Sequence, residues 1–162
     1  MRLFIATPVK LPFFKELKST LTPYIDGNFT QELNLHLTHL FIGEDNPKNY
    51  KFPLPILNEK IKIKDFDFFG ERILFSKAYS PNIDAIYKEL QKRGFVKEQK
   101  PFHPHVTIAR IKKIKEKEEL QKALEAFSSR EVEIPFTVCL YQSILTSSGP
   151  IYKRIYNYSM IF

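Results

Sequence analysis

Two strand-like segments with the same polar pattern constrain the fold more than any other feature of this chain. The sequence LNLHLTHLFI spans residues 33–42, and HVTIARI spans residues 105–111. Each sets a His-x-Thr triplet among apolar residues, which is typical of a half-buried strand. Residues two apart on a strand point to the same face. His36 and Thr38 are therefore expected to point the same way.

His105 and Thr107 are likewise expected to point the same way. Each of the two segments also follows a predicted helix. Residues 12–25 place apolar side chains at helical spacing behind a proline, and residues 81–93 (PNIDAIYKELQKR) form an amphipathic pattern that ends before a glycine. Internal repetition of this kind indicates two copies of one small unit. If the copies face each other, two histidines and two threonines converge on one cleft.

The remaining segments alternate helices with strand pairs. Prolines between residues 47 and 60 allow only a short or broken helix there. This order predicts an α+β fold with mostly antiparallel sheets. Strands are expected at residues 2–6, 61–69 and 72–79, a further helix at 116–127, and a closing antiparallel pair at 132–145 and 151–158.

Composition narrows the class of protein. The 162 residues suit one domain, or two small lobes that share a core. The five glycines leave no glycine-rich phosphate-binding loop. The single cysteine, Cys139, cannot form an intramolecular disulfide, and its apolar surroundings favour a small buried hydrophobe over a reactive thiol.

Hydropathy and charge bear on location and partners. No segment approaches the roughly 18 apolar residues of a membrane span, and the N-terminal apolar run is too short for a signal peptide. We therefore expect a cytoplasmic protein without a membrane anchor, with a monomer as the default. The formal net charge of +7 favours a polyanionic partner. The lysines in residues 112–117 contribute to this charge, but such a run is also typical of a solvated helix entrance.

A pair of histidines that faces a phosphate can perform acid–base chemistry without a metal. The ordinary pKa of histidine lies near 6.5, so one imidazole can take a proton from water while the other gives one to a departing ribose oxygen. Threonine hydroxyls can donate to the non-bridging phosphate oxygens. The alternative is that both histidines are core residues beside strand threonines.

All four histidines lie in or beside the two triplets, so a metal site has to be weighed. His39 stands at an odd offset from His36 and should point to the other face of its strand. His103 and His105 could share a face, but no cysteine, aspartate or glutamate within the motifs completes a ligand set. We therefore expect no catalytic metal.

Strand parity also makes predictions for the neighbours of the triplets. Leu35, Leu37 and Phe41 should face away from the cleft, into a helix layer. Arg110 lies five residues after His105, so parity turns it away from the histidine face unless a β-bulge intervenes.

The two motifs resemble a known family. The segments NLHLTHLFIG (residues 34–43) and PFHPHVTIAR (residues 101–110) resemble the signature motifs of the two-histidine phosphoesterases. The most similar branch is the LigT-like RNA 2′,3′-cyclic phosphodiesterases, historically called 2′-5′ RNA ligases. The start, RLFIATPVKLP, resembles the first strand of that branch, and residues 143–158 (SILTSSGPIYKRIYNY) resemble its closing hairpin.

The resemblance implies one two-lobed domain over residues 1–162. Its two pseudo-symmetric halves would line a central cleft, with helices outside. It also implies hydrolysis of a terminal 2′,3′-cyclic phosphate to a 2′-phosphate, together with a weak, reversible 2′-5′ ligation. The expected substrates are RNA 3′ ends or tRNA fragments that carry a cyclic phosphate, and no cofactor is expected. The residues that match the motifs are His36 and His105 as catalytic pair, Thr38, Thr107 and Arg110 as phosphate ligands, and Tyr152 beside the base.

Two features depart from the family pattern. Family members usually carry an aliphatic residue at the position of His39, so this buried histidine needs a polar partner or solvent. Residues 44–64 are short and rich in proline where a longer helix is common. The sequence does not order the acid and the base; our hypothesis is that His36 protonates the leaving O3′ and His105 activates water.

Two other functions stay open. The chain could be a non-catalytic nucleotide- or RNA-binding domain with the same fold, although intact histidines and threonines in both motifs favour catalysis. It could also be a phosphodiesterase that acts on a small cyclic nucleotide or on an ADP-ribose cyclic phosphate, although the basic charge favours RNA.

Overall fold

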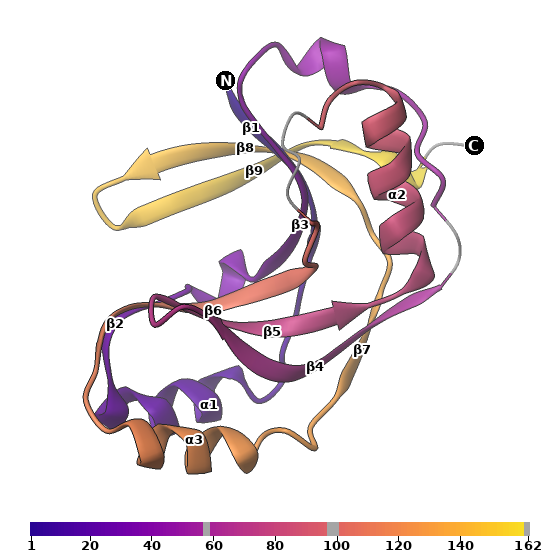
Figure 1. Ribbon diagram of the computed structural model, residues 1–162. Helices are drawn as coiled ribbons and strands as arrows, with labels where there is room; N and C mark the ends of the chain where they lie inside the picture. Colours follow the sequence, from indigo (N-terminus) through magenta and orange to yellow (C-terminus); the bar gives the residue numbers. More distant parts are fainter. Residues whose placement is uncertain (57–58, 97–100, 161–162) are drawn as a thin grey trace.

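The computed structural model describes residues 1–56, 59–96 and 101–160. In this part of the chain, nine strands form one sheet in which all paired strands are antiparallel (Figure 1). The strands are β1 (Arg2–Pro8), β2 (Ile25–Phe29), β3 (His36–Glu44), β4 (Lys60–Phe69), β5 (Ile73–Tyr79), β6 (His105–Ile114), β7 (Val132–Pro135), β8 (Cys139–Thr146) and β9 (Gly149–Asn157). The helices are α1 (Phe14–Leu21), α2 (Pro81–Lys92) and α3 (Lys117–Glu125), and short 3₁₀ turns span Thr22–Tyr24, Glu32–Asn34, Pro47–Tyr50 and Tyr158–Met160.

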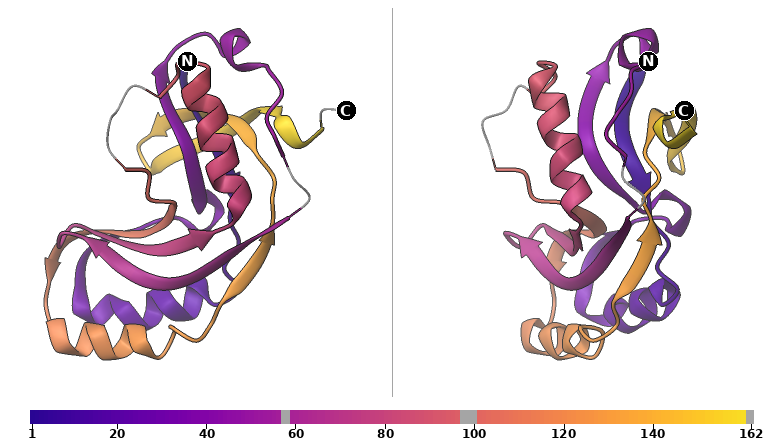
Figure 2. Two further views of the ribbon diagram at one scale, coloured as in Figure 1. Left: turned by 45° about the vertical axis from the view of Figure 1, so that its right-hand side comes forward. Right: turned by 90° about the vertical axis from the view of Figure 1, so that its right-hand side faces the viewer.

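The sheet has two halves that meet between β3 and β6. Its strand order is β7-β4-β5-β6-β3-β1-β8-β9, and β2 also pairs with β6. Figures 1 and 2 show α1 and α3 side by side outside the half that contains β4, β5 and β6, while α2 packs against β3. The predicted α+β fold with mostly antiparallel strands and outer helices is confirmed.

Local sequence signals define α2, the longest of these three helices. The Ser80 hydroxyl accepts a hydrogen bond from the backbone N–H of Asn82 at 3.2 Å, which caps the first turn. Pro81 occupies the first helical position, where its missing N–H is not needed, and Gly94 follows the helix with a φ of +82°. The buried face consists of Ile83, Ile86 and Leu90.

The helix expected over residues 12–25 is shorter than predicted. Helix α1 ends at Leu21, a 3₁₀ turn that contains Pro23 follows, and Ile25 opens β2, a strand that was not predicted. Strand β2 reads IDGNF and lacks a strong apolar alternation. Its Gly27 lies so close to β6 that a Cβ atom there would approach the Arg110 carbonyl oxygen to 2.2 Å. This glycine was the one sequence signal of the close pairing.

The segment expected to be one strand over residues 132–145 is two strands in different halves. Strand β7 ends at Pro135 and pairs with β4, whereas β8 begins at Cys139 and pairs with β1 and β9. Pro135 is compatible with this break because a proline has no N–H to continue a ladder. Cys139 is buried as expected, and burial raises the pKa of its thiol.

Two further boundaries differ or are only partly described. Strand β3 runs past the predicted segment, residues 33–42, to Glu44, and Gly43 pairs with Leu3 at a φ of +88°. A 3₁₀ turn at Pro47–Tyr50 is the short helix expected from the prolines of residues 47–60. Positions 57 and 58 of that segment lie outside the described residues.

His39 faces the core, as its offset from His36 predicts. Its side chain is 3% exposed, its ring stacks on Phe136 at a centroid distance of 5.8 Å, and its Nε2 lies 2.8 Å from the Thr7 hydroxyl. Its Nδ1 is buried and has no hydrogen-bond partner among the described residues. Burial lowers the pKa of His39 to about 3, because a charged imidazole in this place would lose its hydration.

This histidine should make the protein sensitive to acid. Below pH 6.5 the unfolded chain protonates His39 and the folded chain does not, so the free energy of unfolding falls as the pH falls. Between pH 6.5 and pH 5, His39→Leu should avoid a loss of about 1.6 kcal/mol in the free energy of unfolding that the wild type suffers. Urea denaturation at both pH values measures the difference. Parallel losses in the two proteins would show that His39 is not buried in its neutral form.

Candidate active site

All six residues that the sequence singled out line one cleft at the junction of the two halves. The cleft has a volume of about 810 Å³, and β3, β6 and the β8–β9 hairpin contribute to its walls. The six residues are His36, Thr38, His105, Thr107, Arg110 and Tyr152. Their roles remain predictions, but the structure brings their side chains to the same space.

The pairing of β3 with β6 explains why the two triplets meet. The register pair that joins these strands is Leu37 with Val106, the middle residues of the two His-x-Thr triplets. Because the strands are antiparallel, the histidine of each triplet lies opposite the threonine of the other. The two histidines are then diagonal neighbours, which regular geometry separates by about 7–8 Å. That spacing leaves room for a phosphate group between the rings.

Each histidine ring is oriented by a hydrogen bond to the backbone two residues before it. The Nδ1 atom of His36 lies 2.7 Å from the carbonyl oxygen of Asn34, and that of His105 lies 2.6 Å from the carbonyl oxygen of His103. A carbonyl oxygen can only accept, so Nδ1 carries the proton of the neutral ring. In both rings Nε2 is then the atom left to take or give a proton at the cleft.

Aromatic rings flank both histidines in the same way. Two rings contact each imidazole, and three of the four contacts are edge-to-face. Such packing restricts the rotation of the imidazole and shields it from water. The contacts join His36 to Phe4 and Tyr152, and His105 to Phe69 and Phe75, at centroid distances of 4.9–5.4 Å.

The electrostatic setting of His36 favours its neutral form. Burial lowers its pKa below the usual 6.5. The hydrogen bond to Asn34 acts in the opposite direction, and the nearby charge of His105 lowers the pKa further. The two imidazoles therefore interact across the cleft, as an acid–base pair requires.

A one-residue bulge in each motif strand corrects the parity predictions. In β6, Ile108 has no partner between the pairs Thr107–Phe75 and Ala109–Leu74, and in β3 the extra residue is His39. A bulge inverts the alternation of side chains beyond it.

Residues after the bulge therefore turn back to the cleft. Arg110 lines the cleft, although parity alone turned it away, and the bulge that the prediction named as its exception is present. Phe41 was expected to face the helix layer, and this expectation is wrong: its side chain is 59% exposed and lines the cleft. Arg110 and Phe41 stand at equivalent places in the two motifs.

Sequence reasoning missed Arg2 as a cleft residue. Its guanidinium lies over the ring of Phe41, 5.2 Å from the centroid, and both residues line the cleft. Burial raises the pKa of Tyr152, while the charges of Arg110 and Arg2 act to lower it. Both arginines are thus close enough to Tyr152 to affect its hydroxyl. An arginine at the head of the apolar strand β1 was the available signal.

Two side chains fix the β8–β9 hairpin as a wall of the cleft. The side-chain amide of Gln31 donates to the Ser148 carbonyl at 2.8 Å, and that of Asn34 donates to the Pro150 carbonyl at 2.9 Å. Asn34 thus holds the hairpin with its side chain and orients His36 with its backbone. Its role was not predicted, because it depends on contacts distant in the sequence.

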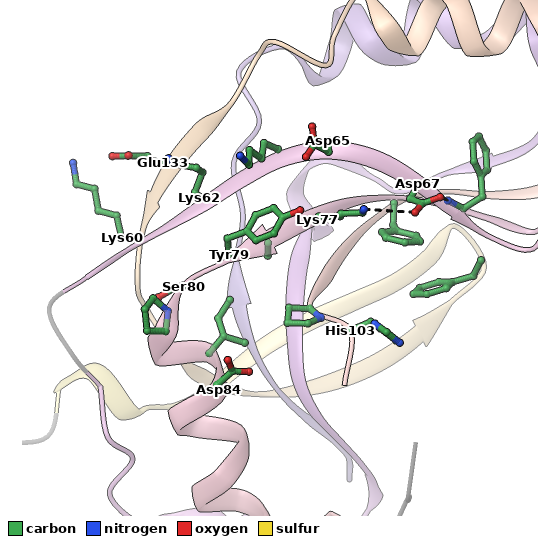
Figure 3. Close-up of a pocket in the computed structure, with 18 residues that line it drawn as sticks. Lys60, Lys62, Asp65, Asp67, Lys77, Tyr79, Ser80, Asp84, His103 and Glu133 are labelled. Atoms are coloured by element: carbon green, nitrogen blue, oxygen red, sulfur yellow. Dashed lines mark hydrogen bonds and ion pairs between the residues drawn. The ribbon is translucent and has the colours of Figure 1, made fainter. Parts of the chain in front are cut away.

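A larger groove lies beside the cleft and is lined by residues of β4, β5 and the start of α2 (Figure 3). Its volume is about 1180 Å³, and Phe69 and Phe75 separate it from His105. Carboxylates accompany its lysines, and Lys77 pairs with Asp67 at 3.6 Å, as the dashed line shows. The charged groups of the groove are Lys60, Lys62, Lys64 and Lys77 with Asp65, Asp67, Asp84 and Glu133.

The described ranges hold neither a metal-binding cluster nor a membrane-spanning helix. No group of three or more His, Cys, Asp or Glu side chains there is placed to hold a metal ion. None of the helices in these ranges is long and apolar enough to cross a membrane.

Comparison with known proteins places this site in a family. The family model described as LigT like Phosphoesterase matches residues 73–152, which include the second motif. An RNA 2′,3′-cyclic phosphodiesterase from Methanocaldococcus jannaschii is 32% identical over 172 aligned residues, which cover 96% of this chain and 98% of that protein. The chain belongs to the LigT-like phosphoesterases. The resemblance predicted from the two motifs is therefore confirmed.

Solved structures show that this LigT-like protein also shares the fold. TT0787 of Thermus thermophilus superposes with a TM-score of 0.68 at 20% identity, covering 97% of this chain and 96% of that one. E. coli LigT complexed with 3′-AMP superposes with a TM-score of 0.65 at 16% identity, covering 96% and 95%. At these identities the likeness concerns the fold alone.

The coupling between the histidines predicts a measurable titration. In the His105→Gln variant the pKa of His36 should rise, because the positive charge that opposes its protonation is gone. Histidine ring NMR shifts followed from pH 4 to pH 9 give this pKa. His103→Gln is the control, since only its backbone carbonyl contacts His105. An unchanged pKa of His36 in His105→Gln would place the rings too far apart to act on one phosphate.

Proposed function

We propose that this protein hydrolyses the 2′,3′-cyclic phosphate at the 3′ end of RNA to a 2′-phosphate, with His36 and His105 as the acid–base pair. The observation that carries the proposal is the pair of imidazoles placed diagonally in one cleft. In each, Nδ1 is hydrogen-bonded to a backbone carbonyl, and Nε2 has no hydrogen-bond partner among the described residues. The name of the M. jannaschii relative, an RNA 2′,3′-cyclic phosphodiesterase, supports the same reaction.

The reaction requires one proton to be taken and one to be given. Nε2 of the neutral histidine removes a proton from water as the water oxygen attacks phosphorus. The bond between phosphorus and O3′ breaks, and Nε2 of the protonated histidine gives its proton to O3′. The product carries a 2′-phosphate and a free 3′ hydroxyl. With a 5′-terminal hydroxyl in place of water as the nucleophile, the same two proton transfers form a 2′-5′ phosphodiester and free the 3′ hydroxyl, which would account for 2′-5′ ligation. The reverse of these steps cleaves that bond and forms the cyclic phosphate again.

The other cleft residues suit the negative charge that the phosphate carries. The hydroxyls of Thr38 and Thr107 lie on the face that presents the histidines and can donate to the non-bridging oxygens. The guanidinium groups of Arg110 and Arg2 add positive charge at the cleft. Tyr152, with its ring edge against His36, offers a surface on which a base can stack.

We assign the acid role to His36 and the base role to His105. In the free protein, burial of His36 favours its neutral form, which opposes this assignment. A bound phosphate anion acts in the opposite direction to burial, because a negative charge beside His36 raises the pKa of its ring. We expect the acid to be protonated in the complex with substrate.

The alternatives differ in substrate or in turnover. A small cyclic nucleotide fits the same chemistry, and a binding domain fits the same cleft. The two arginines and the absence of any carboxylate among the described residues that line the cleft favour a polyanion. We infer that the substrates are RNA 3′ ends or tRNA fragments, and that the protein acts as a cytoplasmic monomer.

The acid–base pair predicts a large and symmetrical loss of activity. A short RNA that ends in a 2′,3′-cyclic phosphate should be converted to the 2′-phosphate in the presence of EDTA. His36→Ala and His105→Ala should each lower kcat by at least roughly 10²-fold, because each removes one proton transfer. Electrophoresis of end-labelled RNA resolves the product, and circular dichroism checks the fold. Nucleotide binding by folded wild-type protein without turnover would favour the binding domain.

A better leaving group separates the acid from the base. A substrate with sulfur in place of O3′ needs little protonation, since a thiol has a pKa of about 8.5. This substrate should restore the activity of His36→Ala by at least about tenfold relative to the oxygen substrate, and should not restore that of His105→Ala. Rates of single turnover for the two variants on the two substrates give the comparison. Rescue of His105→Ala alone would reverse the assignment.

A further inference from the structure

The outer end of β6 carries a positive surface that the proposed reaction does not use. A hollow of about 610 Å³ lies there, between the end of β6, the β4–β5 turn and the start of α3. Four of its seven described lining residues are basic, and Glu71 is the one acidic residue among them. Lys117 is paired with Glu71 at 3.3 Å. Among the described residues Arg72, Lys112 and Lys113 form no ion pair, and the carboxylate opposite Lys113 in the strand register is that of Asp26.

This hollow lies on the strand that carries the second motif. On β2, Asn28 pairs with Arg110 and lines the cleft, and Asp26 pairs with Lys113. Asp26 and Asn28 are two residues apart and therefore share a face of β2. Because Asn28 lines the cleft, Asp26 and its register partner Lys113 also lie on the cleft side of the sheet. Lys112 is the extra residue of a second bulge. Strand β6 therefore presents basic side chains on one side from the phosphate site to its outer end.

The distance along β6 suits a short stretch of RNA. A strand rises about 3.3 Å per residue, so Lys112 lies roughly 16 Å beyond Thr107. Stacked nucleotides rise about 3.4 Å each, so about five of them cover this distance, and fewer do so in an extended chain. A cyclic mononucleotide held at Thr107 cannot reach Lys112.

The path along β6 from the cleft to the outer hollow differs in charge from the groove lined by β4 and β5. That groove is larger, but its four lysines are matched by four carboxylates (Figure 3). The outer hollow has four basic groups against one acidic group in the part of the chain that the structure describes, and the cleft that leads to it contains Arg2 and Arg110 without a lining carboxylate there. A polyanion is therefore attracted along the cleft toward the outer hollow, and it gains little binding energy in the groove lined by β4 and β5.

We propose that Arg72, Lys112 and Lys113, the outer basic surface, bind the sugar–phosphate backbone of RNA on the 5′ side of the terminal cyclic phosphate. This proposal rests on the proposed function and defines its substrate class as oligonucleotides of about five nucleotides or more. The described lining of the hollow contains no aromatic side chain on which a base could stack. The contacts are therefore to phosphates and do not depend on base sequence.

The test compares substrates of different length on two matched variants. The first variant is Arg72→Gln/Lys112→Gln/Lys113→Gln. The second removes the same charge from the neighbouring groove with the triple change at Lys60, Lys62 and Lys64, each to Gln. The substrates are a 2′,3′-cyclic mononucleotide and 12-nucleotide RNAs of two base sequences that end in a cyclic phosphate. Both kcat/KM and its dependence on salt concentration are measured.

The outer variant should lose at least about tenfold in kcat/KM on both 12-nucleotide RNAs at low salt. The slope of log kcat/KM against log salt should become shallower by about 2, since each lost single-strand phosphate contact removes about 0.7. Turnover of the cyclic mononucleotide should be unchanged, which also shows that the variant is folded. The groove variant should keep most of its activity on all three substrates.

Three results would overturn the proposal: an unchanged rate of the outer variant on the RNAs, an equal loss on the mononucleotide, or an equal loss in the groove variant. Binding of a fluorescent 12-nucleotide RNA with a 2′-phosphate end, followed by anisotropy, gives a second readout without turnover. Weaker binding by the outer variant alone supports the outer basic surface even if no substrate is hydrolysed. That combination would contradict only the proposed reaction.

Discussion

The backbone pairing of Leu37 with Val106 is the contact on which the site depends. It joins the two halves of the sheet in the middle of the two His-x-Thr triplets, and both side chains are fully buried on the helix side. Because this pair is antiparallel, the two halves present their polar side chains toward one cleft, and each histidine faces a threonine of the other half. A slip of one residue would turn one triplet to the core, so burial of these two side chains fixes the register.

The bulges add a second level of control. One extra residue follows each triplet, His39 in β3 and Ile108 in β6. As a result, the residue two positions after the extra one points its side chain toward the cleft. In β6 that residue is Arg110, and in β3 it is Phe41, whose ring lies under the guanidinium of Arg2. Both halves thus place an arginine at the cleft: Arg110 lies on the motif strand itself, and Arg2 lies over the ring of Phe41. In β3 the extra residue, His39, is buried, and burial keeps its ring neutral by lowering its pKa.

The sequence predicted the elements that show a clear local pattern of apolar and polar residues. It did not predict features that depend on contacts between segments distant in the sequence. Strand-like runs were enough to predict β1, β4 and β5, and alternation was enough for the four polar residues of the triplets. It failed for β2, whose short sequence IDGNF is a strand because Gly27 permits close approach to β6. It failed for Phe41 because strand parity assumes an unbroken ladder. Arg2 and Asn34 were missed because their contacts to Phe41 and the hairpin join segments distant in the sequence.

The two halves repeat their motif but differ in what surrounds it, and this difference gives the cleft a direction. On the β3 side, the β8–β9 hairpin is tied down by Gln31 and Asn34 and brings Tyr152 against His36. On the β6 side, the strand extends to its basic outer end, near which α3 begins. An RNA end placed in this cleft would meet the β8–β9 hairpin with Tyr152 on one side and an open basic strand on the other. The terminal nucleotide and the chain behind it would therefore have different surfaces to occupy, although the two histidine–threonine pairs between them are nearly symmetric.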